Sequence, residues 1–136
     1  MSTQFPAPTP TELSRPFWQA ANDGRLVIQR CDACGHYRWT PQILCTRCMA
    51  EPFTWTEVSG RGRVHSFTVV HRPPTHEFKA PFVLAVVELD EGPLMLTQIV
   101  GEDRDATAIG APVEVAFTRA SPEINLYTFR LAATPP

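Results

Sequence analysis

The chain has a single lysine, Lys79, and no apolar run approaches the roughly 18 residues that a membrane-spanning helix requires. It contains neither a G-x-S-x-G turn nor a glycine-rich phosphate loop, two common frameworks for catalysis and nucleotide binding. No cysteine lies outside residues 31–48, so no other thiol is available as a nucleophile. The N-terminal residues lack the basic start and apolar core of a secretory signal, which predicts a cytoplasmic location.

Charge is scarce and unevenly distributed along the 136 residues. Residues 1–80 carry nine basic and six acidic side chains, a net charge of +3, whereas residues 81–136 carry three and eight, a net charge of −5. A nucleic-acid-binding protein normally presents a strongly basic face, because phosphate neutralisation supplies most of its affinity. The overall net charge of −2 therefore disfavours nucleic acid as the partner.

All cysteines fall in two C-x-x-C pairs separated by ten residues: Cys31, Cys34, Cys45 and Cys48. Each pair can place two thiolates on one side of a tight turn, and two facing turns form a tetrahedral cage that suits Zn²⁺. With no fifth ligand in the pattern, the metal is expected to be structural. Two disulfides or a four-thiolate iron site are the alternatives, and the ligand type favours zinc.

The N-terminal segment is predicted to contain two short helices. A capping-box pattern at residues 9–12 would start the first helix, and a second would begin at Pro16 and end at Gly24. The second helix carries Phe17 and Trp18 but has little apparent core of its own. Since large aromatics are favoured interface anchors, we expect these two side chains to bind a partner subunit. Packing against the rest of the chain is the alternative.

The rest of the chain divides into two predicted β domains, after an N-terminal segment of residues 1–25. Residues 26–53 form the predicted zinc ribbon, in which Tyr37 and Trp39 would cover the metal turns. Residues 54–136 predict five antiparallel strands, at 62–72, 82–90, 93–100, 112–119 and 125–132. Five short strands fit a small OB-type barrel, with an open sandwich as the alternative that periodicity alone does not separate.

The order of these features resembles the acyl-CoA-associated proteins that join a rubredoxin-like zinc ribbon to an OB-fold. One departure is Thr46, where the family often has proline, and it leaves the four cysteine ligands unchanged. The matching residues run nearly end to end: Phe17-Trp18, Gly24, Leu26, Gln29-Arg30-Cys31, Cys34-Gly35, Pro41, Cys45, Cys48, Trp55, 59–62, Val64, Ser66, 81–83, 89–92 and 109–113.

The resemblance implies a mainly β protein: a short N-terminal helix, a rubredoxin-like zinc ribbon and a five-stranded OB-fold barrel. Such proteins are typically small subunits that pair with thiolases, thiolase-like aldolases or enoyl-CoA hydratases. The larger partner carries the chemistry, while the small subunit stabilises it and helps to shape the acyl-CoA site. The resemblance thus implies a non-catalytic accessory role, with steroid side-chain degradation or other lipid degradation as its setting. Steroid side chains, other branched acyl-CoAs and aromatic acyl chains are all open as substrates.

The sequence offers no nucleophile–base pattern for catalysis by this chain. His65 and His71 share one predicted strand, and His76 lies in the loop that follows. A histidine on a strand is more often a solvated or satisfied residue than a catalyst. The chain alone is therefore not expected to be an enzyme.

Four cations flank the first predicted barrel strand: Arg61, Arg63, Arg72 and Lys79. The CoA tail carries phosphates, and arginine matches phosphate in a bidentate fork, so these residues are candidate CoA contacts. A solvated strand rim is the alternative. OB barrels also bind single-stranded nucleic acids, which is the alternative function for the whole chain.

Overall fold

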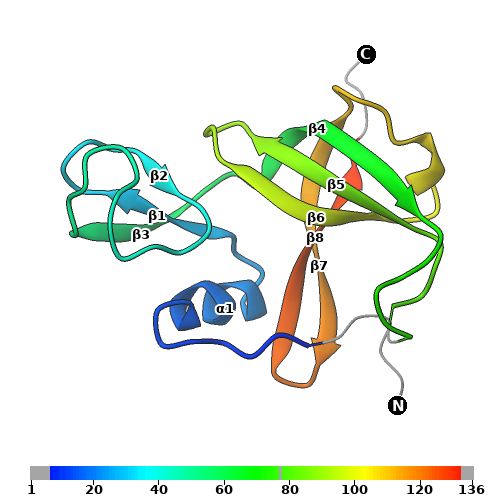
Figure 1. Ribbon diagram of the computed structural model, residues 1–136, viewed down its shortest axis with the longest axis horizontal. Helices are drawn as coiled ribbons and strands as arrows, with labels where there is room; N and C mark the ends of the chain where they lie inside the picture. Colours follow the sequence, from blue (N-terminus) through cyan, green and yellow to red (C-terminus); the bar gives the residue numbers. More distant parts are fainter. Residues whose placement is uncertain (1–6, 77, 133–136) are drawn as a thin grey trace.

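The computed structural model describes residues 7–76 and 78–132, and within them a ribbon and a barrel lie side by side with one α-helix between them (Figure 1). In these ranges no helix is long and apolar enough to cross a membrane. The predicted mainly β architecture is confirmed. The elements in chain order are α1 (Arg15–Asn22), β1 (Val27–Cys31), β2 (Tyr37–Arg38), β3 (Phe53–Glu57), β4 (Arg61–Val70), β5 (Phe82–Leu89), β6 (Leu94–Val100), η1 (Arg104–Ala106), β7 (Pro112–Ser121) and β8 (Ile124–Leu131).

Helix α1 is the second of the two predicted helices. Pro16 occupies its first turn, where the missing N–H costs no hydrogen bond. The other predicted helix is wrong: before α1 the described chain forms only a turn, in which the Ser14 N–H donates to Thr11 Oγ1 at 3.1 Å. The few residues available before Pro16 do not repay helix nucleation. The helix ends at Asn22, and Gly24 follows as the predicted stop residue, with a φ of 76° and an N–H that donates to the Ala21 carbonyl at 3.0 Å.

The zinc ribbon is a three-stranded antiparallel sheet in the order β2-β1-β3. Strand β3 pairs with β1 along its whole length, from Cys31↔Phe53 to Val27↔Glu57. The domain boundary expected between residues 53 and 54 therefore falls inside a strand of the ribbon sheet. The ribbon extends to Glu57, and the barrel begins with β4.

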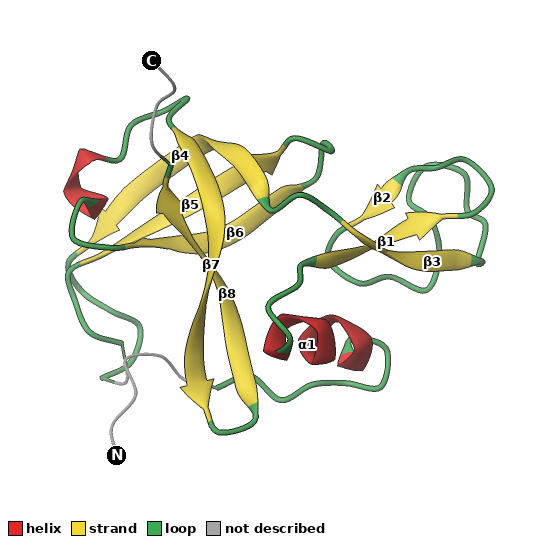
Figure 2. Ribbon diagram, turned by 180° about the vertical axis from the view of Figure 1, so that it is seen from behind, coloured by secondary structure: helices red, strands yellow, loops and turns green. Residues whose placement is uncertain are grey.

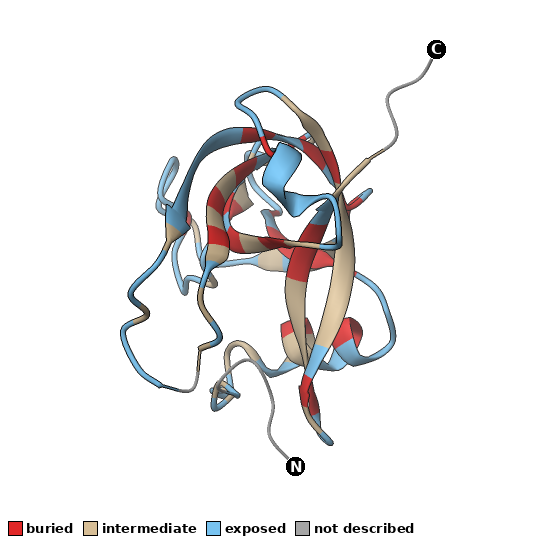
Figure 3. Cartoon of the chain, turned by 90° about the vertical axis from the view of Figure 1, so that its right-hand side faces the viewer, coloured by how far each residue is buried: buried red, intermediate tan, exposed pale blue. Residues whose placement is uncertain are grey.

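Strands β4 to β8 close into a barrel in the order β4-β5-β6-β8-β7. Neighbours are antiparallel except β6 and β8, which run parallel at Ile99↔Phe129 and Val100↔Arg130. Closure confirms the five-stranded OB-type barrel and excludes the open sandwich. Buried residues line its interior, while η1 lies exposed on the surface (Figure 3). The interior side chains are Val64, Val83, Ala85, Val87, Leu89, Met95, Ile99, Val113 and Phe129.

Strand β4 depends on a glycine for its close approach to β5. A Cβ on Gly62 would collide with the carbonyl oxygen of Glu88, so no other residue fits without a backbone shift. Just beyond, the pairing register shifts between Val64 and Ser66, a bulge that bends the strand around the barrel.

The β7–β8 hairpin projects from the barrel and reaches helix α1 (Figure 2). The Asn22 side chain at the end of α1 bridges the two. Its Nδ2 donates to the Glu123 carbonyl at 2.7 Å, and its Oδ1 accepts the Asn125 backbone N–H at 2.9 Å. The hairpin therefore fixes the position of the helix against the barrel.

Four aromatic rings fill the junction of helix, ribbon and barrel. The Phe17 ring lies 5.0 Å from Trp18, 4.9 Å from Trp39 and 5.5 Å from Tyr127 between centroids, and Phe17 is only 1% exposed. The premise that this helix lacks a core is wrong, and Phe17 is not accessible to a partner in this structure. Trp39 also packs here instead of covering the metal turns. Trp18 remains half-buried.

Candidate functional site

The four cysteine sulfurs converge at one end of the ribbon, with all Sγ atoms within 4.8 Å of one another. Those of Cys31 and Cys48 are 3.5 Å apart, and those of Cys34 and Cys45 are 3.6 Å apart. Tetrahedral zinc with Zn–S bonds of about 2.3 Å separates its sulfurs by roughly 3.8 Å, so the spacing fits that ion. All four cysteines are free, whereas a disulfide would hold two sulfurs about 2.05 Å apart. The donor set is that of a closed four-thiolate metal site.

The two C-x-x-C turns have matching backbone geometry. The Gly35 N–H donates to the Cys31 carbonyl at 2.9 Å, and the Met49 N–H donates to the Cys45 carbonyl at 2.9 Å. Gly35 has a φ of 78° and Met49 a φ of 67°, so both turns end in the left-handed region. Glycine adopts this conformation freely, whereas Met49 holds it against the steric cost of its Cβ.

Backbone N–H groups stabilise negative charge on the sulfurs. The N–H groups of Arg47 and Cys48 donate to Cys45 Sγ at 3.4 and 3.5 Å. The Cys34 N–H is the main cause that lowers the pKa of Cys31 to about 6. For Cys48 a backbone hydrogen bond lowers the pKa, but contact with the neighbouring sulfurs outweighs it and raises the pKa to about 12. A cation at the centre of the set would favour deprotonation of all four thiols.

Two buried polar side chains brace the loop between the metal turns. Gln29 donates from Nε2 to the Gln42 carbonyl at 3.1 Å and accepts the Gln42 N–H at Oε1 at 2.7 Å. Arg38 is 1% exposed and donates to four backbone carbonyls. These belong to Gln42, Ile43, Ala50 and Pro52, at 3.3, 3.2, 2.9 and 3.2 Å. Neither residue was predicted for the site, because nothing in the sequence separates a buried arginine bound to carbonyls from an exposed one.

The outward side of strands β5 and β6 carries an apolar patch. Leu94 is 47% exposed and Leu96 is 57% exposed, and the patch ends at Glu88, which is paired with Leu94, and at Gln98. An antiparallel sheet with a solvated side normally alternates apolar and polar residues, whereas residues 82–87 and 94–96 are apolar on both sides. That is the pattern of a sheet whose outward side is covered over this stretch. The members of this β5–β6 face are Leu84, Val86, Leu94 and Leu96.

A groove of about 490 Å³ connects the β5–β6 face with helix α1. Its lining includes Leu84 and Leu96 from the face, together with Trp18, Tyr127 and Phe78. A second hollow of about 250 Å³ shares the same two leucines, so the apolar surface continues toward β4. Trp18 therefore borders the exposed apolar surface, whereas Phe17, the preceding residue of the helix, is buried.

The predicted phosphate contacts are divided between the two ends of β4. Arg61 and Arg63 lie at its start, Arg72 lies just past its end, and Lys79 follows in the next loop. A strand of 10 residues spans about 30 Å, so these cations do not converge on one phosphate group. Arg63 donates instead to the Gly110 carbonyl at 3.1 Å.

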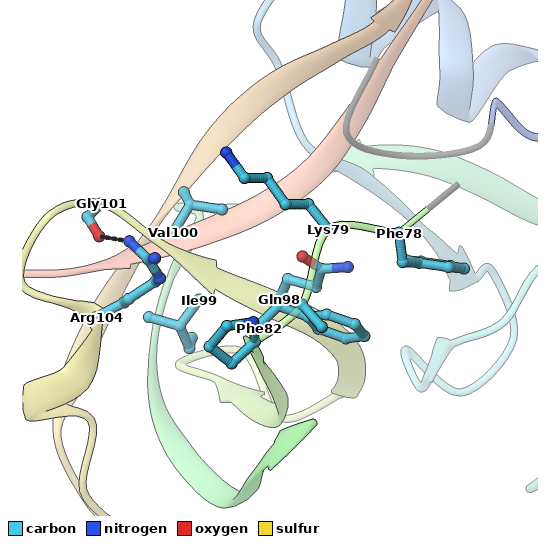
Figure 4. Close-up of a pocket in the computed structure, with 10 residues that line it drawn as sticks. Phe78, Lys79, Phe82, Gln98, Ile99, Val100, Gly101 and Arg104 are labelled. Atoms are coloured by element: carbon cyan, nitrogen blue, oxygen red, sulfur yellow. Dashed lines mark hydrogen bonds between the residues drawn. The ribbon is translucent and has the colours of Figure 1, made fainter. Parts of the chain in front are cut away.

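Lys79 has a cationic neighbour that sequence reasoning missed. It lines a pocket of about 360 Å³ together with Arg104, whose Nη1 donates to the Gly101 carbonyl at 3.0 Å (Figure 4). The rings of Phe78 and Phe82 stack beside them with centroids 5.5 Å apart. Arg104 stands in an acidic stretch of the sequence, and only the fold brings it to the same pocket as Lys79.

The histidines lie at the surface. The Nδ1 atom of His65 is 4.0 Å from Glu88 Oε1, and both side chains are more than half exposed. His71 and His76 are exposed in the loop after β4.

Comparisons with known proteins identify the family. The family model for the ChsH2 rubredoxin-like zinc ribbon domain matches residues 18–53, and that for the ChsH2 C-terminal OB-fold domain matches residues 55–118. A DUF35 domain-containing scaffold protein of Methanothermobacter thermautotrophicus is 36% identical over 83% of this chain and 86% of its own length. This chain belongs to the DUF35 family. Its four-thiolate centre is a structural zinc site.

Two further similar proteins are informative. The solved structure of an Ltp2-ChsH2(DUF35) aldolase contains a chain that matches with a TM-score of 0.84 and 38% identity, over 93% of this chain and 100% of that one. A probable enoyl-CoA hydratase alpha subunit of Thermomonospora curvata is 43% identical over 85% of this chain. The present chain covers only 37% of that subunit's length. The relatives are thus scaffold proteins or parts of multi-subunit enzymes.

Proposed function

We propose that this chain is an accessory subunit that docks on a thiolase-like enzyme acting on acyl-CoA substrates. It stabilises that enzyme and does not itself carry the reaction. The observation behind the proposal is the β5–β6 face, which is apolar and exposed in the isolated chain. Contiguous exposed apolar surface of this kind is typical of protein interaction sites.

The energetics favour a protein surface as the occupant of this face. Removing apolar area from water stabilises a complex by about 25 cal/mol per Å² before the costs of association, and Leu94 and Leu96 have roughly half of their surface available. None of the four residues of the face is charged, and Glu88 lies at its edge opposite Leu94, so docking on the face itself does not require ionised groups to lose their water. We therefore expect an apolar, uncharged surface on the partner. Trp18 extends the docking surface along the adjoining groove.

The names of the similar proteins support an accessory role, because they describe a scaffold protein, a component of an aldolase and a hydratase alpha subunit. We extend this to a thiolase or retro-aldolase partner for the present chain. Its proposed substrates are lipid-derived acyl-CoA thioesters, with steroid side chains among them.

The chain also contributes cations to the shared acyl-CoA site in this proposal. Lys79 and Arg104 line one pocket, and two cations can bind the phosphates of the CoA tail. They replace the wider set predicted from sequence, since Arg61 and Arg63 lie at the other end of β4.

Single-stranded nucleic acid is the weaker alternative. OB barrels bind it on the face of their second and third strands, through stacking aromatics and a basic groove. Those strands are β5 and β6 here, and the centre of their outward side, at Leu84, Val86, Leu94 and Leu96, is aliphatic and uncharged. The outward side includes one aromatic ring, Phe82, and its charged residue, Glu88, is acidic.

The test is co-expression with a thiolase-like protein encoded beside this chain, followed by size-exclusion chromatography. Wild-type chain is expected to co-elute with the enzyme. Leu96→Lys places a charge in the centre of the apolar face and should weaken binding by about 2 kcal/mol or more. The matched control is Ile109→Lys, at a residue 73% exposed in the loop between β6 and β7, which should co-elute normally.

Separate elution of the wild-type chain from every such candidate would refute the docking proposal. Normal binding by Leu96→Lys would refute the surface assignment while leaving the accessory role intact. Turnover of acyl-CoA at enzymatic rates by the purified chain alone would show that it is more than an accessory subunit.

A further inference from the structure

Arg38 is a buried cation without a carboxylate partner. Its side chain is 1% exposed, and none of the ion pairs in the described part of the chain includes it. Its hydrogen bonds go to neutral backbone carbonyls, which orient the guanidinium without cancelling its charge. The Phe53 ring also covers it, with the guanidinium carbon 5.1 Å from the ring centroid. A buried charge is costly unless an opposite charge compensates it.

The zinc site supplies that opposite charge. One Zn²⁺ with four thiolates carries a net charge of −2 by its composition. The carbonyls of Ile43 and Ala50, which flank the second C-x-x-C turn, both accept from Arg38 and hold the guanidinium next to the metal loop. The Arg38 Nε–H is fully buried and has no hydrogen-bond partner in the described structure.

We propose that Arg38 is a positioning residue of the zinc centre, whose cation balances the tetrathiolate charge and whose unpartnered Nε–H serves a cysteine sulfur of the centre when zinc is bound. The four carbonyl bonds fix the guanidinium, and the zinc–thiolate group offsets the cost of burying it. Outer partners of this kind tune metal affinity strongly. The inference concerns the metal centre alone and does not depend on the proposed docking role.

Arg30 provides a matched control within the same ribbon. It is also an arginine near a metal turn, donating from Nε to the Gly35 carbonyl at 3.3 Å, and it lies 5.6 Å from the Tyr37 ring centroid. Unlike Arg38 it is exposed, so water screens its charge. Loss of its charge should therefore leave the zinc centre unchanged.

The first measurement is zinc affinity of the full chain by competition with a chromophoric chelator at fixed pH. Arg38→Gln should bind zinc about 10- to 100-fold more weakly than wild type, the usual effect of losing such a partner. Arg38→Lys keeps the charge and should lose less affinity than Arg38→Gln. Arg30→Gln should bind zinc as wild type does. Wild-type affinity in Arg38→Gln would overturn the proposal.

The second measurement separates this role from simple bracing of the loop. Cobalt(II) in place of zinc gives a sulfur-to-metal charge-transfer band, which moves to lower energy when the thiolates lose a cation or a hydrogen-bond donor. Arg38→Gln should shift this band, and Arg30→Gln should not. Weaker metal binding with an unshifted band would mean that Arg38 only braces the loop, and would overturn the proposal. If Arg38→Gln does not fold, Arg38→Lys decides: it lacks the Nε–H, so an unshifted band in that variant overturns the proposal as well.

Discussion

The ring centroids of Phe17 and Trp39 lie 4.9 Å apart, so helix α1 and the zinc ribbon share one core. Tyr127 of the barrel lies 5.5 Å from each of these rings and joins the third part of the chain to the same cluster. The Phe17 side chain therefore contacts both β domains, and its removal should destabilise both.

Replacing Phe17 with alanine should lower the free energy of unfolding by about 3–5 kcal/mol, because the truncation leaves a cavity among three other rings. Urea denaturation followed by circular dichroism measures the loss. The control is Ile109→Ala, at a side chain 73% exposed, which should change stability by no more than about 0.5 kcal/mol. A loss below about 1 kcal/mol for Phe17→Ala would contradict the buried position of this residue.

Removal of the metal should unfold the ribbon. Structural zinc contributes on the order of 10 kcal/mol or more to folding. A strong chelator should therefore change the fluorescence of Trp39 and Trp55, which lie in the ribbon, and Cys34→Ser should yield poorly soluble protein. Elemental analysis should find one zinc per chain. Iron in its place, or a metal-free chain with an intact ribbon, would count against the assignment.

The matching turns allow a reciprocal test of backbone strain. Gly35→Ala should destabilise the zinc-loaded protein by about 1 kcal/mol, because φ at this position is 78°. A Cβ there would meet Arg30 only at an ordinary contact distance of 3.5 Å, so backbone strain is the main effect. Met49→Gly should relieve the same strain and stabilise by about 1 kcal/mol, since Met49 is 66% exposed and loses little burial. Equal stability of both variants and wild type would refute the argument.

Single-stranded DNA and RNA should bind weakly at best. Fluorescence anisotropy at about 150 mM salt should reveal no submicromolar affinity, because the chain has a net charge of −2 and an aliphatic β5–β6 face. Tight binding that weakens steeply with added salt would instead favour the nucleic-acid alternative.

The sequence predicts those features that depend on local pattern. The C-x-x-C spacing identifies the four metal ligands, because such ligands must lie close together in the chain within each turn. The period-two alternation at residues such as Val113, Val115 and Phe117 predicts strands of the barrel. Closure of that barrel depends on the parallel pairing of β6 with β8, which is a long-range contact without a local signature.

Apart from the first predicted helix, the errors concern contacts between residues that are distant in the sequence. Phe17 seemed to lack a core because its neighbours Trp39 and Tyr127 come from other domains. The sequence does not reveal that Arg38 is buried and braces the loop between the metal turns, since its partners are backbone carbonyls that exist in any sequence. Arg104 lines the same pocket as Lys79 because the loop after β6 brings it there, which the sequence does not show.

The shared aromatic cluster also bears on the entropy of association. Because ribbon, helix and barrel meet on Phe17, and Asn22 fastens the helix to the β7–β8 hairpin, the domains cannot reorient independently without breaking buried contacts. A partner that binds the barrel therefore receives the ribbon already in place, and no interdomain freedom is lost on binding. Preorganisation of this kind raises affinity without adding a contact, so a small subunit can hold a much larger enzyme through a modest interface.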